Sequence, residues 1–197
     1  MIFKQLQSGV KVTDKTFDAV YPKFIRDLSE IYFTPVNVAK VAAKFLANQV
    51  NAKILDIGSG SGKFCMIGAS YTTGHFTGVE QREHLCQLST EISQLYQLPN
   101  IRFIHANLTT IDFNAFNGFY LFNPFSENFA IVGMIADETD LQSILYHQYT
   151  DHVRSALEDM PVGTRLATFF STCREVPPTY RVQAEHFEGK LKLMVKA

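Results

Sequence analysis

The chain has 197 residues, 46% of them hydrophobic, and a formal net charge of −1. This length and hydrophobic content predict one compact unit with a full core, and a second domain is not expected. Lysine and arginine residues are scattered along the chain, so no basic face is predicted for a nucleic acid or an anionic membrane. The charge distribution therefore disfavours a nucleic-acid partner but does not exclude one.

The sequence has no clear pattern for a membrane span, a signal peptide or a set of disulfides. No apolar run approaches the roughly 20 residues of a membrane span, and Met1–Gln5 lacks a signal-peptide pattern. We therefore expect a cytoplasmic protein with no membrane partner. Cys65, Cys86 and Cys173 are odd in number and widely spaced, which predicts neither a disulfide framework nor a metal motif, so we assign no metal. The sequence carries no signal for an oligomeric state.

The opening of the chain is predicted to be helical. Apolar residues recur at three- and four-residue steps from 13 to 29, with Pro22 as a candidate break. A second helix is expected from Pro35 to about Asn48, because Thr34 followed by proline is typical of an N-cap and the first helical position.

Strands and helices alternate along the rest of the chain. The expected strands are 53–57, 75–80, 101–106, 118–122 and 164–171, followed by a hairpin of 180–187 and 190–196 that turns at Glu188-Gly189. The expected helices are 62–71, 82–97 and 139–158. This order predicts an α/β fold with a single doubly wound, mostly parallel seven-stranded sheet, helices on both faces, a C-terminal antiparallel hairpin and an N-terminal helical cap. Ligands of such sheets bind beyond the carboxyl ends of the strands.

A glycine-rich loop follows the first strand. Gly58, Gly60 and Gly62 form G-x-G-x-G directly after an apolar run and before a helix. The spacing differs from the G-x-G-x-x-G of dinucleotide-binding loops, and the loop lacks the residues that a P-loop requires. Because glycine lets the backbone approach a ligand closely, the loop predicts a nucleoside-cofactor site, with a flexible Gly/Ser turn as the alternative.

Together with the acidic residue two positions earlier, this loop resembles the first motif of the class I S-adenosylmethionine (SAM) dependent methyltransferases. The resemblance implies that Asp56 meets the amino group of the cofactor or braces the loop. It also implies that Gly58, Ser59, Gly60 and Gly62 lie at the methionine portion of SAM.

Further cofactor contacts are expected after the second and third strands. Glu80 lies 22 residues after Gly58, where a carboxylate can accept both ribose hydroxyls; the alternative is a solvated carboxylate at a strand end. The resemblance places Asn107 near the adenine, at a position where the family often has an aspartate, and Gln81 and the backbone N–H of Leu108 are further candidates for adenine contacts. Asn107 is equally suited to capping the next turn. Lys63 is expected to be exposed, with neutralisation of the cofactor carboxylate as the alternative.

The segment Asn123-Pro124-Phe125 follows the fourth strand. It resembles the fourth motif, Asn/Asp/Ser-Pro-Pro-aromatic, of methyltransferases that act on planar or amide nitrogens, but it has one proline and its aromatic residue comes one position early. The resemblance implies that Asn123 and Pro124 accept hydrogen bonds from the target nitrogen and that Phe125 packs on the acceptor. An ordinary Asn-Pro turn is the alternative.

The resemblance implies an enzyme, a SAM-dependent methyltransferase that methylates a nitrogen of a small molecule or of a protein side chain. A catalytically silent SAM-binding or protein-interaction module is the alternative, and the glycine spacing makes a nicotinamide oxidoreductase a distant third. Residues 1–50 are expected to form a helical cap or lid, in one compact unit with a SAM-binding domain of residues 51–197.

Overall fold

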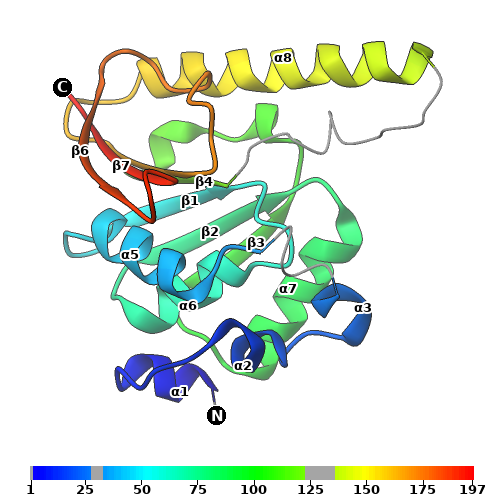
Figure 1. The fold of residues 1–197 in the computed structure, drawn as a ribbon, viewed down its shortest axis with the longest axis vertical. Helices are drawn as coiled ribbons and strands as arrows, with labels where there is room; N and C mark the ends of the chain where they lie inside the picture. The colour runs from blue at the N-terminus through cyan, green and yellow to red at the C-terminus, as the bar shows by residue number, and fades with distance from the viewer. Residues whose placement is uncertain (1, 28–32, 123–135) are drawn as a thin grey trace.

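The structure, a computed structural model, describes residues 2–27, 33–122 and 136–197, with the backbone alone for 136–144. Its centre is one sheet of seven strands in the order β3-β2-β1-β4-β5-β7-β6 (Figure 1). The strands are β1 (Lys53–Ile57), β2 (His75–Glu80), β3 (Ile101–His105), β4 (Gly118–Phe122), β5 (Arg165–Phe169), β6 (Tyr180–His186) and β7 (Leu191–Lys196). The first five strands are parallel, and β7 pairs antiparallel with both β5 and β6. The predicted fold class is confirmed.

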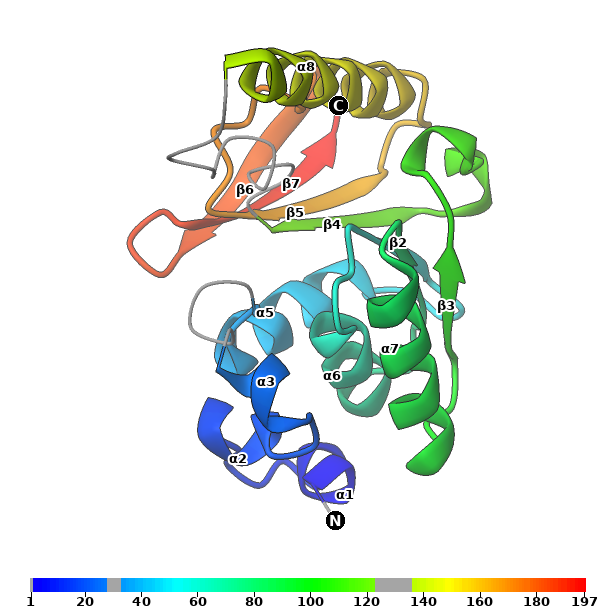
Figure 2. The same cartoon turned by 90° about the vertical axis from the view of Figure 1, so that its right-hand side faces the viewer.

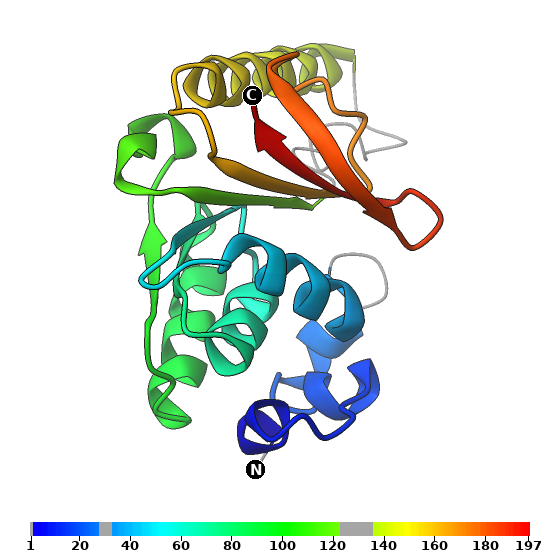
Figure 3. The same ribbon diagram turned by 90° about the vertical axis from the view of Figure 1, so that its left-hand side faces the viewer.

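Helices cover both faces of this sheet, as predicted. One face carries α5 (Val36–Leu46), α6 (Lys63–Tyr71) and α7 (Glu83–Leu95), and the opposite face carries α8 (Ala136–Glu158) (Figure 2). Two single-turn 3-10 helices, η1 (Leu108–Thr110) and η2 (Phe113–Ala115), connect β3 to β4. The short helices α1 (Ile2–Gln7), α2 (Asp14–Asp18) and α3 (Lys23–Arg26) form a further layer outside α5 and α6 (Figure 3).

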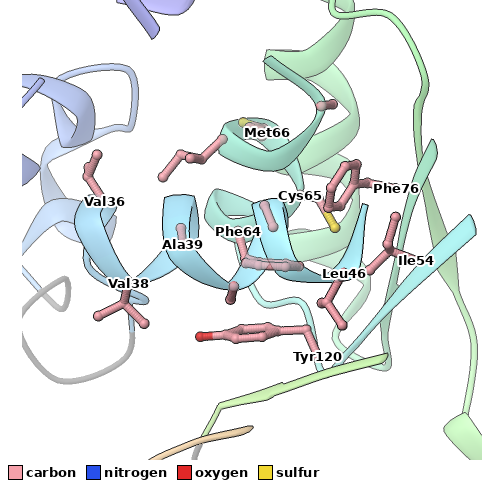
Figure 4. Close-up of a cluster of buried hydrophobic side chains, with 14 of the residues drawn as sticks. Val36, Val38, Ala39, Leu46, Ile54, Phe64, Cys65, Met66, Phe76 and Tyr120 are labelled. Carbon is pink, nitrogen blue, oxygen red and sulfur yellow. The ribbon is translucent and has the colours of Figure 1, made fainter. Parts of the chain in front are cut away.

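Side-chain alternation along the central strands divides the core into two clusters, because successive residues of a strand point to opposite faces. Ile54 and Tyr120 pack with α5 and α6 (Figure 4), whereas Leu55 and Phe119 pack under α8. The Tyr120 ring stacks on Phe64 of α6 with centroids 3.8 Å apart. The strands are buried on both faces, which is why their sequences are nearly continuous apolar runs.

The N-terminal helices differ from the prediction in detail. Pro22 does break the predicted stretch 13–29, since its described part, up to residue 27, forms the two helices α2 and α3, while α1 was not anticipated. The prediction that Thr34 caps α5 was wrong: Pro35 is the N-cap, with no side-chain cap hydrogen bond. The Thr34 hydroxyl is instead buried and lies 2.9 Å from the hydroxyl of Tyr120 in β4. A buried hydroxyl partner on the sheet competes successfully with the helix terminus for this side chain.

Strand ends also shift slightly. β3 ends one residue earlier than predicted, and β5 spans Arg165–Phe169 rather than 164–171. Phe170 has a φ of 52°, a left-handed conformation that interrupts the extended backbone. Among the helices that the structure describes, none is long and apolar enough to cross a membrane.

Candidate functional site

The glycine loop connects β1 to α6 at the carboxyl edge of the parallel strands. Its backbone is bound to the neighbouring strand β2, because the N–H groups of Gly58 and Ser59 both donate to the carbonyl of Val79, at 3.0 and 2.9 Å. Gly58, Gly60 and Gly62 have φ values of 73°, 55° and 79°, in the left-handed region that favours glycine. The loop is therefore an ordered structure with a defined backbone.

The three glycines are needed for different reasons. A Cβ on Gly62 would lie 2.5 Å from the ring of Phe103 and 2.8 Å from Cβ of Ser89, so close packing against β3 and α7 excludes any side chain there. A Cβ on Gly58 or Gly60 would meet no atom of the described residues within 4 Å. These two positions leave an open space beside the backbone, which suits the close approach of a ligand.

Ser59 lies against β2. A Cβ on Gly78 would lie 2.6 Å from the hydroxyl oxygen of Ser59, so Gly78 makes room for that side chain. The Ser59 hydroxyl is buried and has no hydrogen-bond partner among the residues that the structure describes. Sequence reasoning did not single out Gly78, although a glycine inside a strand often marks such a close approach.

Asp56 is buried in β1, where it is 4% exposed. Its Oδ2 accepts a hydrogen bond from the Cys65 thiol of α6, with Sγ and Oδ2 3.4 Å apart. Burial raises the pKa of Asp56 to about 7; the thiol opposes this rise and the nearby Glu80 charge adds to it. Asp56 is therefore poised between its neutral and ionised forms near neutral pH, and a cation brought close would favour the ionised form.

Glu80 ends β2 with its carboxylate buried, so the predicted alternative of a solvated carboxylate was wrong. Oε2 accepts the N–H of Gly60 at 2.8 Å, and Oε1 accepts the N–H of Arg82 at 2.9 Å. The Arg82 guanidinium adds Nε at 2.8 Å to Oε1 and Nη2 at 3.2 Å to Oε2. Burial raises the pKa of Glu80, but the hydrogen bonds and charge of Arg82 and the Gly60 N–H together bring it below its ordinary value. Glu80 is thus a carboxylate at neutral pH, bound directly to the glycine loop.

The residues expected near the adenine meet beside α8. Asn107 caps η1, since its Oδ1 accepts from the N–H and the hydroxyl of Thr109 at 3.0 and 2.8 Å. Its Nδ2 donates to the hydroxyl of Tyr149 at 2.9 Å, and that hydroxyl lies 3.4 Å from Oε1 of Gln81. The next residue, Leu108, is buried. Sequence reasoning missed Tyr149, because only the packing of α8 on η1 brings it to this edge.

Lys63 was expected to be exposed, and this was wrong. It is 4% exposed, and its Nζ lies 2.7 Å from Oδ1 of both Asp14 and Asp18 in α2. In addition, the Tyr21 hydroxyl donates to the carbonyl of Ser61 at 3.2 Å. Two aspartates supply the opposite charge that a buried ammonium requires, so the N-terminal layer is fixed directly to the glycine loop and the start of α6.

The acceptor end of the predicted site is described only up to Phe122. Asn123, Pro124 and Phe125 lie outside the described residues. The Phe122 ring lies 5.3 Å from that of Phe169 and 6.4 Å from that of Phe170, measured between centroids. These rings line the carboxyl ends of β4 and β5, and Phe170 is 51% exposed.

Comparison with known families identifies the class of this site. A family model described as a methyltransferase domain matches residues 48–147, which include β1, the glycine loop, Glu80 and Asn107. The chain belongs to this methyltransferase-domain family. The resemblance predicted from the glycine loop is thereby confirmed. No curated protein sequence matches the chain.

Solved structures of methyltransferases share the fold. TrmN from Thermus thermophilus is 20% identical with a TM-score of 0.61, over 83% of this chain and 49% of TrmN. An RNA methyltransferase from Salinibacter ruber in complex with S-adenosyl-L-homocysteine (SAH) is 19% identical with a TM-score of 0.53, over 83% of this chain and 91% of its own. The [4+2]-cyclase SpnF is 14% identical with a TM-score of 0.51, over 68% of this chain and 43% of SpnF.

This methyltransferase-family chain therefore spans about half the length of TrmN and less than half of SpnF. At such identities the likeness concerns the fold alone. Because a cyclase shares this fold, the fold by itself does not fix the reaction.

Proposed function

We propose that the chain is a SAM-dependent methyltransferase that transfers a methyl group to a nitrogen of a small molecule or of a protein side chain. One observation carries the cofactor assignment: a buried, ionised Glu80 is hydrogen-bonded to Gly60 of a loop whose glycines leave open space. Membership in the methyltransferase-domain family supports methyl transfer, and the SAH bound to the Salinibacter ruber enzyme supports SAM as the cofactor.

The residues fit the three parts of SAM. The open space at Gly58 and Gly60 suits the methionine portion, and a buried carboxylate at Glu80 suits a ribose diol. Asp56, the penultimate residue of the neighbouring strand β1, is proposed to meet an ammonium group. Gln81, Asn107 and Leu108 remain the proposed adenine contacts.

When bound, SAM supplies an electrophilic methyl group on a cationic sulfonium. The chain contributes orientation and exclusion of water. The aromatic rings of Phe122, Phe169 and Phe170 provide an apolar wall at the ends of β4 and β5, and such a wall favours a reaction in which the sulfonium loses its charge.

The acceptor residues are proposed from sequence position. β1 and β4 are parallel neighbours with Ile57 in register with Leu121, so both strands end at the same edge of the sheet. Asn123 and Pro124 follow β4 directly and are proposed to orient the acceptor nitrogen, with Phe125 packing on its plane.

The N-terminal residues 1–50 are proposed to act as a cap in one unit with residues 51–197. The ion pairs of Lys63 with Asp14 and Asp18 support this, because they cross the boundary between the two parts. Direct packing of α5 against β4, β5 and β7 supports it as well.

Isothermal titration of the purified chain with SAM, SAH and NADH tests the cofactor. We expect micromolar binding of SAM and SAH and none of NADH. A ligand-free preparation that binds neither SAM nor SAH would refute the proposal, and binding of NADH would favour an oxidoreductase.

Screening acceptors with methyl-labelled SAM tests the reaction. Once an acceptor is found, Asn123→Ala should lower turnover more than cofactor affinity, because the proposed contact is made with the acceptor. Tight SAM binding without transfer to any amine, amide or protein acceptor would favour the silent binding module.

A further inference from the structure

The carboxylate proposed to hold the ribose is already saturated with donors. A carboxylate offers about four lone-pair sites. Glu80 uses two of them for backbone N–H groups, from Gly60 and Arg82, and two for the side chain of Arg82. A ribose diol therefore finds no free acceptor site on Glu80 in this structure.

The two kinds of donor differ in how easily they can leave. The Gly60 and Arg82 N–H groups belong to the ordered glycine loop and to the N-cap residue of α7. The Arg82 side chain, in contrast, is 46% exposed, whereas that of Glu80 is 2% exposed. A side chain can move without breaking the backbone of the loop or of α7, so the guanidinium, which is the more exposed donor, is the one that a ligand would displace.

The guanidinium also resembles the group that would replace it. Nε and Nη2 donate side by side to the two oxygens of one carboxylate, in the fork geometry typical of arginine. A ribose presents its two adjacent hydroxyls as a similar pair of donors. Arg82 thus forms the two bonds that a ribose diol would form with the same two oxygens.

We propose that Arg82 is an internal competitor for the cofactor, whose guanidinium occupies the ribose-hydroxyl position on Glu80 and has to leave before the ribose binds. The inference rests on the proposed function, because it concerns the same cofactor site. Only the fraction of molecules with Arg82 displaced is competent to bind, and this fraction lowers the apparent affinity in proportion. Arg82 is therefore a residue that sets cofactor affinity without contacting the reacting atoms.

Titration of Arg82→Ala with SAH tests the competition, and SAH is chosen because it carries no net charge. We expect the Kd to fall about two- to fivefold relative to the wild type, the scale of a partly exposed ion pair. Arg82→Gln, which keeps much of the side-chain length, should show a gain as well. Arg102→Ala is the matched control, because it removes an arginine that donates to Thr77 on β2, away from Glu80, and its Kd should stay at the wild-type value.

Two further readouts separate competition from a general change in the site. Raising the salt concentration screens the Arg82–Glu80 pair, so SAH should bind the wild type more tightly at high salt and bind Arg82→Ala equally at both. The gain in Arg82→Ala should also vanish for the 2′,3′-dideoxy analogue of SAH, which has no hydroxyls to exchange for the guanidinium.

Both variants have to be folded, which thermal unfolding checks. Equal or weaker SAH binding by folded Arg82→Ala and Arg82→Gln would overturn the inference, because Arg82 would then support the site rather than compete for it. Failure of the wild type to bind SAM or SAH would refute the proposed function instead. The two failures are thus distinguishable in one set of titrations.

Discussion

The buried ammonium of Lys63 permits the sharpest test of how the N-terminal layer is attached. The side chains of Lys63 and Asp18 are 4% and 7% exposed, and Asp14, at 50%, closes the cluster from the solvent side. The rings of Phe17 and Phe33 lie 5.6 and 5.5 Å from Nζ. The ammonium is thus held among two carboxylates and two aromatic faces, with little access to water.

Lys63→Met keeps the apolar stem and removes the charge. Asp18 is then a buried carboxylate that has lost the ammonium at 2.7 Å, and removal of one partner of a buried pair costs about 3 to 5 kcal/mol. Asp18→Asn should cost less, about 1 to 2 kcal/mol, because Asp14 still pairs with Lys63. A combined Lys63→Met and Asp18→Leu variant should recover much of the loss, since no buried charge is left without its partner.

The assay is urea unfolding at neutral pH, with the free energy of unfolding extrapolated to water. Lys23→Met is the matched control, because Lys23 pairs with Asp27 at 2.8 Å on an exposed surface, with side chains 80% and 59% exposed. We expect it to change the free energy of unfolding by less than about 0.5 kcal/mol. A loss in Lys63→Met as small as in this control would refute the reasoning, since it would mean that the ammonium is hydrated.

Three other predictions concern the site. The pKa of the Asp56 carboxyl is about 7 in the folded protein and lies at its ordinary, lower value in the unfolded chain. The protonated carboxyl therefore stabilises the fold at low pH, and this contribution is lost as the pH rises through about 7. Asp56→Asn should flatten this decline when the free energy of unfolding is measured against pH. Gly62→Ala should destabilise the fold by about 2 to 4 kcal/mol, since its Cβ would overlap Phe103, whereas Gly60→Ala should cost less stability but weaken SAH binding. Glu80→Ala should weaken SAM binding by about 1.5 to 3 kcal/mol, the scale of charged hydrogen bonds. Urea unfolding checks the stability losses of the glycine variants, and calorimetric titration of folded Gly60→Ala and Glu80→Ala checks the affinities. Unchanged affinity in either variant would remove that residue from the site.

The order of the elements was predictable from the sequence because local physics dictates it. The run from Ile54 to Ile57 is buried on both faces and ends in a glycine loop, a pattern typical of a central parallel strand. The hairpin at Glu188-Gly189 follows from turn residues with positive φ. In both cases the signal lies within a few residues of the element that it defines.

The contacts that complete the candidate site were not predictable in this way. Lys63 meets Asp14 across 49 positions, and Asn107 meets Tyr149 across 42. Each side chain alone looks like an ordinary surface residue, and only the packing of α2 or α8 gives it a partner. The pairing of Arg82 with Glu80 is local, but whether an arginine folds back on a carboxylate or extends into water depends on how deeply that carboxylate is buried.

The glycine loop is held from both sides, and this bears on how a cofactor would bind. On one side Gly58, Ser59 and Gly60 donate to the end of β2, and on the other Tyr21 donates to Ser61 from the N-terminal layer. A loop fixed before binding loses little conformational entropy when a ligand arrives, so more of the contact energy is left for affinity. In the described part of this site, the proposed displacement of the Arg82 side chain from Glu80 is then a step that cofactor binding would still require.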